Sequence, residues 1–445
     1  MNHRIRMHWT PSYYTSVRSS YSKLLNAIII RPMVESIFTE QAIGRFLWSD
    51  IISHIDIPSS NCSHMDGFVV IYNDIMKISK HGPIKLRVVP RTKFGKSENQ
   101  VLYTGQAIRI STGEVLPRLG DTVIPVEYTD FDSKSNTVII QRDFAKGSFV
   151  SYKGSEIASK DLLLSKGHAL RAQDLALVSM LGIRKLKVFK KPRVAIVPTG
   201  NELTEKMTDI KLGKILNTNS RVISSLIETS GGAPLDLGIT PDNIQKIKNK
   251  IRIALSECDI ILTTGGSSVG LRDLVAESIN DIGRPGILVH GVKLDRGRVT
   301  GLAALRSRAI IILPGPIQGA VNAFIVFAHP LIRLMLGLQP FTKPFILAKL
   351  TEGWNARKKF QIFTKIVYVK MSRSASGDFY AKPISGETTD ITVLTRSNGF
   401  ILVPERSTAI EKGQKVKINV FPGLSFPSGN PIEFHYQSEK SFLPF

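Results

Sequence analysis

The sequence is poor in cysteine and in uninterrupted apolar runs. Its two cysteines, Cys62 and Cys258, are too few for a disulfide framework and do not have the spacing of zinc ligands. We therefore expect a reducing compartment and a packing role for both thiols. No apolar run approaches the roughly 18 residues of a membrane span, because polar residues interrupt the longest candidate, 320–338. We predict a buried helix there and no membrane association.

Acidic residues are also scarce. The chain has 36 Asp and Glu against 59 Lys and Arg, which gives a net charge of +23. Such a charge attracts polyanions at low salt. The basic residues are spread along the chain, which favours a solvated basic surface, and nucleic-acid binding is the weaker alternative.

Residues 1–34 contain no Asp or Glu but several Lys and Arg among serines and tyrosines. This composition fits either a transit peptide or a disordered extension. The segment has no clear amphipathic stripe, so we predict a disordered basic extension and a cytoplasmic protein.

The length of 445 residues predicts several folding units. Apolar residues near helical spacing predict an amphipathic helix over Glu35–Ile52. Two later regions consist of short β-rich pieces separated by Gly, Pro and Asp, which is typical of small barrels or sandwiches. The predicted division is a linker domain of 35–58 and 158–190, a β-domain of 59–157, an α/β domain of 191–338, a barrel-like C-terminal β-domain of 339–420 and an irregular tail of 421–445.

Within 191–338, strand patterns alternate with helix patterns. This alternation predicts a parallel sheet covered by helices on both faces, a three-layer α/β domain. Ligands of such sheets collect at the carboxyl ends of the strands. The expected site therefore comprises Thr199–Glu202, Asp242, Gly265–Asp273 and Leu313–Gly315.

The segment Ile260–Asp273 reads IILTTGGSSVGLRD, an apolar strand followed by glycines, serines and a helix start. Backbone N–H groups at a helix N-terminus are unpaired, and glycine lets a phosphate approach the main chain closely. Asp273 lies where the helix begins. It either holds a metal ion or a water over the anion, or is only a helix-start residue.

Four motifs in order resemble those of the molybdopterin molybdenumtransferase family, whose eukaryotic counterpart is the E domain of gephyrin. They are CSHMDGF at 62–68, RISTGEVLP at 109–117, TGNEL at 199–203 and GGSSVGLRD at 265–273. The similarity runs from about Glu35 to Val420.

This resemblance implies an enzyme of molybdenum cofactor biosynthesis. Such an enzyme inserts molybdate into adenylylated molybdopterin, its substrate, and releases AMP with the help of Mg²⁺ or another divalent cation. The resemblance also implies four domains and a homodimer in which the partner completes each cleft. Whether the oxyanion is molybdate or tungstate is left open.

The resemblance also assigns residues. Glu202, Asp242 and Asp273 would hold the metal and the nucleotide phosphates, because Mg²⁺ prefers carboxylate oxygens. Asp66 would position molybdate as a fourth catalytic acid, and Thr112 would donate a hydrogen bond to an oxyanion. The alternative for each is a turn, a helix cap or a surface side chain. The other predicted substrate contacts are Thr199, Gly200, Gly265, Gly266, Ser267, Ser268, Gly270, Lys293, Arg296, Arg298, Pro314 and Gly315.

Two motifs depart from the family pattern. DRGRV at 295–299 stands where the family has Lys-Pro-Gly-Lys-Pro, and LPGPIQG at 313–319 where it has Leu-Pro-Gly-Asn-Pro-Val-Ser. An acid in a phosphate site is unfavourable unless a neighbour such as Lys293 or Arg296 compensates its charge, and Arg298 keeps a positive charge nearby. We predict a divergent active transferase. The alternative is a non-catalytic paralogue that binds the pterin nucleotide or scaffolds a partner.

Overall fold

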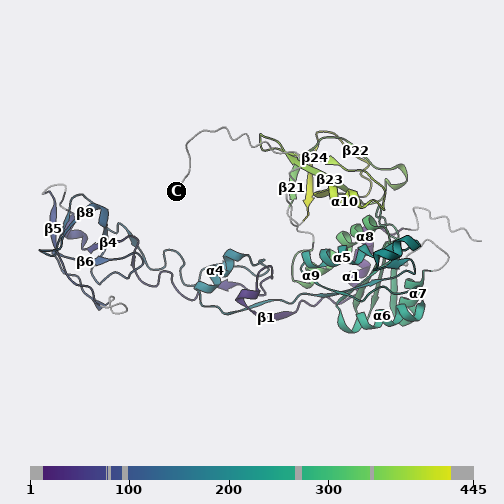
Figure 1. Ribbon diagram of the computed structural model, residues 1–445, viewed down its shortest axis with the longest axis horizontal. Helices are drawn as coiled ribbons and strands as arrows, with labels where there is room; N and C mark the ends of the chain where they lie inside the picture. Colours follow the sequence, from purple (N-terminus) through teal and green to yellow (C-terminus); the bar gives the residue numbers. More distant parts are fainter. Residues whose placement is uncertain are drawn as a thin grey trace, which may run out of the picture. The chain divides into compact units, whose positions relative to one another are not determined.

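The chain divides into two compact units, Ser36–Val188 and Met1–Glu35 together with Phe189–Phe445 (Figure 1). The computed structural model describes residues 14–76, 78, 82–92, 99–265, 273–340 and 345–421. Where the chain passes between the units, β1 (Val34–Phe38) and β12 (Lys185–Phe189) form a two-stranded sheet.

The prediction of a helix over Glu35–Ile52 is wrong. This segment instead contains β1, the 3-10 turn η2 (Thr39–Gln41) and β2 (Ile51–Ile52). Gly44 has a positive φ of 73°, which interrupts any helix at that point. Four of the apolar residues that suggested a helix, Ile37, Ala42, Leu47 and Ile51, pack instead into a small cluster with residues of α4 (Ala172–Met180) and neighbouring strands, whereas Ile43 is exposed. Pairing and burial therefore outweigh the local helical spacing.

The β-domain of the smaller unit is a six-stranded sheet in the order β7-β4-β6-β5-β9-β8. Strand β4 is buried on both faces, because Phe68 packs into one apolar cluster and Val69 into another. This confirms the predicted β-rich segment. The strands are β4 (Gly67–Val70), β5 (Ile84–Val88), β6 (Gln106–Ile110), β7 (Thr122–Pro125), β8 (Thr129–Asp132) and β9 (Thr137–Ile140), and this region also contains the helix α2 (Tyr72–Ile75) and the paired short strands β3 (Cys62–Ser63) and β10 (Val150–Ser151). The strand β11 (Leu162–Leu164) pairs with β2 instead.

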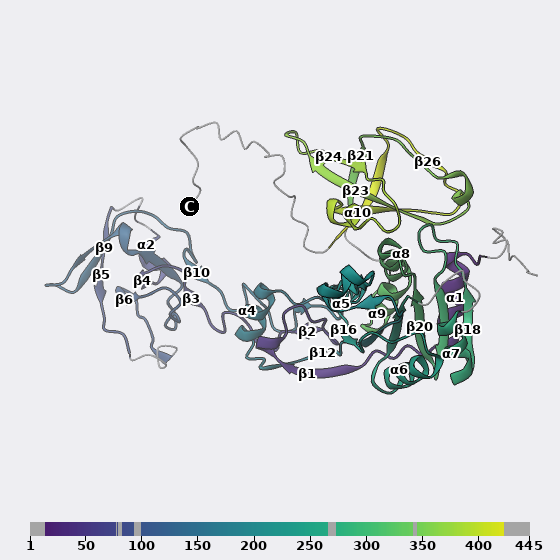
Figure 2. The same ribbon diagram turned by 45° about the vertical axis from the view of Figure 1, so that its right-hand side comes forward.

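A second six-stranded sheet forms the centre of the larger unit, in the order β16-β13-β17-β20-β19-β18 (Figure 2). Its first four strands run parallel, which confirms the predicted parallel sheet, and β19 and β18 extend it through two antiparallel pairings, β20 with β19 and β19 with β18. The antiparallel pair was not predicted. The strands are β13 (Arg193–Pro198), β16 (Ala233–Asp236), β17 (Ile260–Thr264), β18 (Pro285–His290), β19 (Gly301–Leu305) and β20 (Arg308–Leu313).

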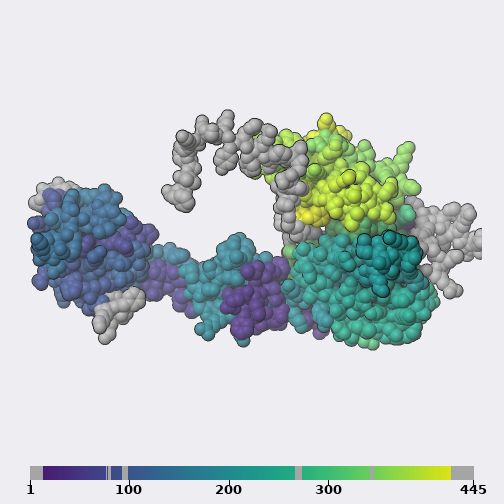
Figure 3. Space-filling view, in the orientation of Figure 1, coloured from purple at the N-terminus to yellow at the C-terminus, as the bar shows by residue number. Residues whose placement is uncertain are grey.

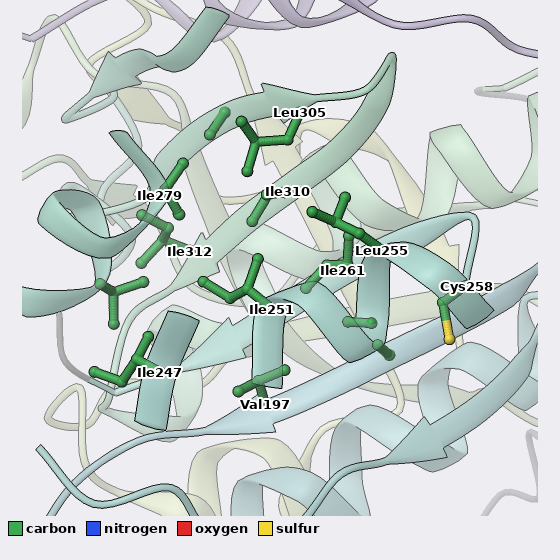
Figure 4. Close-up of a cluster of buried hydrophobic side chains, with 14 residues drawn as sticks. Val197, Ile247, Ile251, Leu255, Cys258, Ile261, Ile279, Leu305, Ile310 and Ile312 are labelled. Carbon is green, nitrogen blue, oxygen red and sulfur yellow. The ribbon is translucent and has the colours of Figure 1, made fainter. Parts of the chain in front are cut away.

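Helices cover both faces of this sheet. On one face, α6 (Ile244–Glu257) and α7 (Leu274–Ile282) pack against the strands through a wholly apolar cluster (Figure 4). In this cluster Ile251 of α6 lies among side chains of the central strands, including Ile261 and Ile310. On the other face lie α5 (Thr218–Thr229), α1 (Val17–Ala27) and one long helix. The three predicted layers are therefore present.

Helix α1 corrects the prediction of disorder over residues 1–34. Ser16 caps this helix by accepting a hydrogen bond of 3.1 Å from the Ser19 N–H, and Leu24 is completely buried. Tyr21 packs its ring against Phe327 of the long helix, with 6.4 Å between the ring centroids. Apolar burial of one helix face accounts for the order of a segment whose composition suggested none. Residues 1–13 lie outside the described part of the chain.

The long helix runs from Ile317 to Met335 as α8 (Ile317–Ala323), the π-helical turn η6 (Phe324–Ala328) and α9 (His329–Met335). By length and composition alone it could cross a membrane, but 78% of its most apolar stretch is buried inside the protein. This is the burial of a core helix, and it confirms the predicted buried helix.

The C-terminal strands form a closed barrel in the order β21-β24-β23-β25-β27 around an apolar core, as predicted. The barrel packs directly on the α/β part of the same unit (Figure 3). Its elements are β21 (Phe345–Leu350), β22 (Trp354–Asn355), β23 (Lys365–Arg373), β24 (Phe379–Pro383), α10 (Ile391–Arg396), β25 (Gly399–Val403), β26 (Ala409–Ile410) and β27 (Lys415–Val420).

Candidate functional site

A cavity of about 410 Å³ lies at the carboxyl ends of the parallel strands. This is the edge at which the sequence places the site. Thr199, Gly265 and Gly315 follow β13, β17 and β20, and all three line the cavity. The other residues around it are Glu202, Leu203, Ile215, Leu216, Asn217, Thr218, Asn219, Thr264, Pro316, Ile317 and Thr389.

Two helix N-termini open onto this cavity. Helix α5 begins at Thr218 after its cap Asn217, and the long helix begins at Ile317 after Pro316. The first N–H groups of a helix have no partner within the helix and carry partial positive charge. Two such ends at one cavity make it suited to a phosphate or another oxyanion.

The turn after β17 requires glycine at its first position. Gly265 has a φ of 84°, and a Cβ on it would lie 2.2 Å from the carbonyl oxygen of Thr199. Thr199 is fully buried and donates its N–H to Thr264 over 2.8 Å. The main chain of β13 and that of the turn are thus in contact beneath the cavity. The predicted contacts Gly266, Ser267, Ser268 and Gly270 lie outside the described residues.

Two of the predicted acids lie at adjacent positions of this edge. A Cβ on Gly200 would lie 2.4 Å from Oε1 of Glu202, so the Glu202 carboxylate folds over Gly200. Asn201 and Asp242 form a reciprocal pair, in which each backbone N–H donates to the other side chain over 3.2 and 3.1 Å. Both acids are exposed. Asn201, the neighbour of Glu202, therefore links the loop after β13 to the loop that carries Asp242.

Asp273 has a different role in the described structure. Its Oδ1 accepts the Ala276 N–H over 2.9 Å and caps α7, and its Oδ2 lies 2.8 Å from Nε2 of His290. Both carboxylate oxygens are therefore engaged, and the side chain is only 11% exposed. Sequence reasoning did not find His290, which lies at the end of β18, a strand it did not predict.

The three acids are not gathered into one metal centre. Among the residues that the structure describes, no group of three or more His, Cys, Asp and Glu side chains is placed to hold a metal ion. Mg²⁺ commonly takes only one or two carboxylates and completes its shell with phosphate oxygens and water. Glu202 and Asp242 fit that pattern, whereas Asp273 in this arrangement does not.

The predicted basic contacts do not line the cavity. The Arg296 guanidinium donates to Oε1 of Gln318, and its burial lowers the pKa of Arg296. The Arg298 guanidinium lies 5.9 Å from the centre of the Phe360 ring. The Lys293 N–H and carbonyl bond to the backbones of Thr15 and Thr364.

The charge of Arg296 interacts electrostatically with Asp295, as expected, but the ion pair of Asp295 is made with a residue that the sequence did not indicate. The Asp295 carboxylate pairs with the Arg357 guanidinium of the C-terminal segment. Sequence spacing could not reveal this partner, which is 62 residues away.

Gln318 fastens a loop of the C-terminal domain to this edge. Its side-chain amide donates to the carbonyls of Glu387 and Asp390 over 2.5 and 2.7 Å, and its backbone N–H donates to Thr388 over 3.3 Å. Gln318 is fully buried. The loop it holds places Thr389 at the cavity.

Sequence reasoning missed most of the other residues of the cavity, among them the polar residues Asn217, Asn219 and Thr389. Asn219 donates a hydrogen bond from its side-chain amide to the Gly315 carbonyl over 2.7 Å and so joins α5 to the turn after β20. The predicted contact Pro314 is buried in this turn. The strand-to-helix segment ILNTNS carried a usable signal for the two asparagines, because such turns supply helix caps. Thr389 carried none, because another domain supplies it.

Asp66 and Thr112, predicted separately, form a pair in the smaller unit. The Asp66 Oδ1 accepts the Thr112 N–H over 2.6 Å and the Thr112 hydroxyl over 2.9 Å. These two hydrogen bonds lower the pKa of Asp66. The hydroxyl that was expected to bind an oxyanion thus donates to Asp66.

Three family models together match most of the chain. They are the MoeA N-terminal region (domain I and II) over residues 15–182, the probable molybdopterin binding domain over 195–334 and the MoeA C-terminal region (domain IV) over 348–421. The chain belongs to the MoeA family. The predicted resemblance and multidomain fold are confirmed.

Individual relatives match this chain over nearly its whole length. A molybdopterin molybdenumtransferase of Staphylococcus epidermidis is 28% identical over 387 residues, which cover 87% of this chain and 91% of that protein. One from Staphylococcus aureus is 26% identical, with coverages of 90% and 94%. The crystal structure of a molybdopterin biosynthesis MoeA protein from Pyrococcus horikoshii OT3 has a TM-score of 0.76 at 27% identity, and the match covers 92% of this chain and 100% of that one.

Proposed function

We propose that this MoeA protein is a molybdopterin molybdenumtransferase of molybdenum cofactor biosynthesis, which inserts molybdate into adenylylated molybdopterin and releases AMP. The observation that carries the proposal is the convergence of two helix N-termini and the Gly265 turn on one cavity, with Glu202 at its side. Relatives that this chain matches over nearly their whole length are named for this activity.

In this proposal the cavity binds the diphosphate linkage of the substrate. The unpaired N–H groups at Thr218 and Ile317 face the phosphate oxygens, and Gly265 allows close approach of the main chain. Thr199 supports that turn from below and holds it in place. When the linkage is cleaved, water adds to phosphorus and AMP departs, and the helix ends stabilise the negative charge that develops on the oxygens.

Glu202 and Asp242 are the residues that would hold Mg²⁺, which when bound neutralises charge on phosphate oxygens. Glu202 also lies at the cavity, where its carboxylate can accept a proton from the attacking water. Asp273 has an indirect role in this proposal. It caps α7 and thereby orients the segment that precedes this helix.

The decisive experiment is an AMP-release assay. The purified protein is given adenylylated molybdopterin, Mg²⁺ and molybdate, and AMP is quantified against time. We expect release by the wild type and a loss of about a hundredfold or more in Glu202→Ala. Glu228→Ala is the matched control, since Glu228 is exposed on α5 away from the cavity. No release above the Glu202→Ala level would overturn the proposal, and tight binding without turnover would identify a non-catalytic paralogue.

A homodimer in the cytoplasm belongs to the same proposal. The family resemblance assigns Asp66 and Thr112 to the cleft of the partner subunit, so Asp66→Ala and Glu202→Ala should damage different halves of one composite site. Mixing the two inactive variants under conditions that exchange subunits should restore part of the AMP release. If the mixture stays inactive although mass spectrometry shows mixed dimers, Asp66 does not serve the partner's cleft.

A further inference from the structure

A second cavity lies at the opposite, amino-terminal edge of the same sheet. It has a volume of about 360 Å³. Its walls include Pro192, Asp259 and Arg308, which stand at the amino ends of β13, β17 and β20. The candidate active site occupies the carboxyl ends of these same strands, so the two cavities are separated by the length of the sheet.

This second cavity is strongly basic. Arg31, Lys190, Arg306 and Arg308 line it, and Asp259 is the one acidic residue among its lining residues. The Asp259 carboxylate already accepts the Arg193 N–H over 2.8 Å. The positive charge around the cavity therefore exceeds what its own carboxylate can balance.

One of the four cations has a structural explanation. The Arg308 guanidinium donates to the carbonyls of Leu255 and Cys258, so it caps the C-terminus of α6, where a helix carries partial negative charge. Among the residues that the structure describes, no side-chain hydrogen bond of this kind is found for Arg31, Lys190 or Arg306. Within the part of the chain that the structure describes, none of these three forms an ion pair.

The backbone holds the three cations at the rim. The Lys190 N–H donates to the Met33 carbonyl over 2.8 Å, and the Ile29 N–H donates to the Ser307 carbonyl over 3.0 Å. These bonds join the segment that carries Arg31 to Lys190, the residue after β12, and to the tight turn between β19 and β20. In that turn Arg306 and Ser307 have positive φ values of 49° and 59°, where asparagine and glycine are favoured. The backbone conformation of the turn therefore does not explain why an arginine occupies position 306.

We propose that this cavity binds a small phosphate-bearing anion, at a site distinct from the candidate active site and independent of the proposed transferase activity. Guanidinium groups match phosphate oxygens in a bidentate geometry, and a lysine adds a third positive charge. A concave site of this volume encloses a diphosphate-sized group. The extended backbone of a nucleic acid would instead require a basic surface that continues beyond the cavity.

The test measures binding of inorganic pyrophosphate to the full chain by calorimetry at physiological salt. The triple variant Arg31→Gln/Lys190→Gln/Arg306→Gln should bind at least about tenfold more weakly than the wild type. The control Lys246→Gln/Arg252→Gln/Arg284→Gln removes the same charge from exposed positions outside the cavity and should keep the wild-type affinity. Equal losses in both triple variants would show general attraction to a basic protein and overturn the proposal.

Hydrogen–deuterium exchange then distinguishes the two edges of the sheet. Pyrophosphate should protect peptides around Lys190 and the Arg306–Ser307 turn in the wild type and in the control, but not in the triple variant. Protection confined to peptides around Gly265 and Gly315 would place the anion at the other edge and overturn the proposal. Tighter binding of an oligonucleotide than of pyrophosphate, lost in the triple variant, would assign the cavity to nucleic acid and also overturn it. AMP release should be unchanged in all these variants, so failure here leaves the proposed function standing.

Discussion

The carboxylate of Asp295, in the loop between β18 and β19, forms an ion pair with the guanidinium of Arg357 in the C-terminal segment. The Asp295 side chain is 13% exposed and that of Arg357 is 48% exposed. Lysine occupies the Asp295 position in the family motif that this chain resembles. The exchange from lysine to aspartate is therefore balanced by a cation from the neighbouring domain.

Removing this carboxylate should weaken the attachment of the barrel to the α/β part. We expect Asp295→Asn to lower the free energy of unfolding by about 1 kcal/mol, because the pair is partly screened by solvent. Asp295→Lys should lower it further, since it sets a cation beside Arg357. The double variant Asp295→Lys/Arg357→Glu should recover most of that loss. Urea unfolding checks this, and independent, additive effects of the two substitutions would contradict the pairing.

The Gly265 turn makes a sharp steric prediction. Gly265→Ala places a methyl group 2.2 Å from the Thr199 carbonyl oxygen at a φ of 84°, and we expect a loss of about 2 to 4 kcal/mol in unfolding free energy. Gly315→Ala is the matched control on the same edge, because its Cβ would meet nothing within 4 Å. Thermal unfolding of the two variants compares them directly. Equal stabilities would show that the turn rearranges at little cost.

Much of this edge followed from the sequence, for physical reasons that particular residues illustrate. The runs around Ile196, Ile261 and Ile311 are apolar on both faces, as buried parallel strands must be, and glycines stand where each strand ends. Glu202 and Asp242 then fall at one edge whatever the details of the loops. Strand pattern and parallel topology together fix which residues meet there.

Other parts of the site depend on contacts between distant segments. Thr389 and Arg357 come from the C-terminal domain, and no local pattern ties them to the sheet. The hairpin of β18 and β19 was missed because the residues of GLAAL are small and apolar without alternation. Likewise, the apolar spacing over Glu35–Ile52 fits a helix as well as it fits the observed strands and turn, and only strand pairing with distant residues distinguishes the two.

Gln318 should be important for both stability and substrate affinity. Gln318→Met keeps the volume but leaves the carbonyls of Glu387 and Asp390 and the guanidinium of Arg296 without their partner. We expect about 2 kcal/mol of lost stability and a raised KM in AMP release, because Thr389 is no longer held at the cavity. Gln245→Met on the exposed face of α6 should change neither quantity. A Gln318→Met protein with wild-type KM would show that the loop keeps its place without the glutamine.

From the Asp66–Thr112 pair we predict a change in the pKa of Asp66 that can be measured at its carboxyl group. Both Thr112 donors favour the ionised carboxylate and lower the pKa of Asp66. Thr112→Val removes the hydroxyl and keeps the N–H, so the pKa of Asp66 should rise towards its ordinary value, and Asp66 should take up its proton at higher pH. Carboxyl-carbon NMR of aspartate-labelled protein reports this directly. Thr129→Val is the control, since the Thr129 hydroxyl donates to the Val126 carbonyl instead.

The same substitution has a consequence for activity if ionised Asp66 is needed for molybdenum insertion. A higher Asp66 pKa moves the acid limb of the pH–rate profile to higher pH, so the activity of Thr112→Val should fall earlier as the solution is acidified. The rate well above the pKa should change less, because Asp66 is ionised there in both proteins. An unmoved acid limb in a variant whose Asp66 pKa has risen would show that activity does not depend on the ionisation of Asp66.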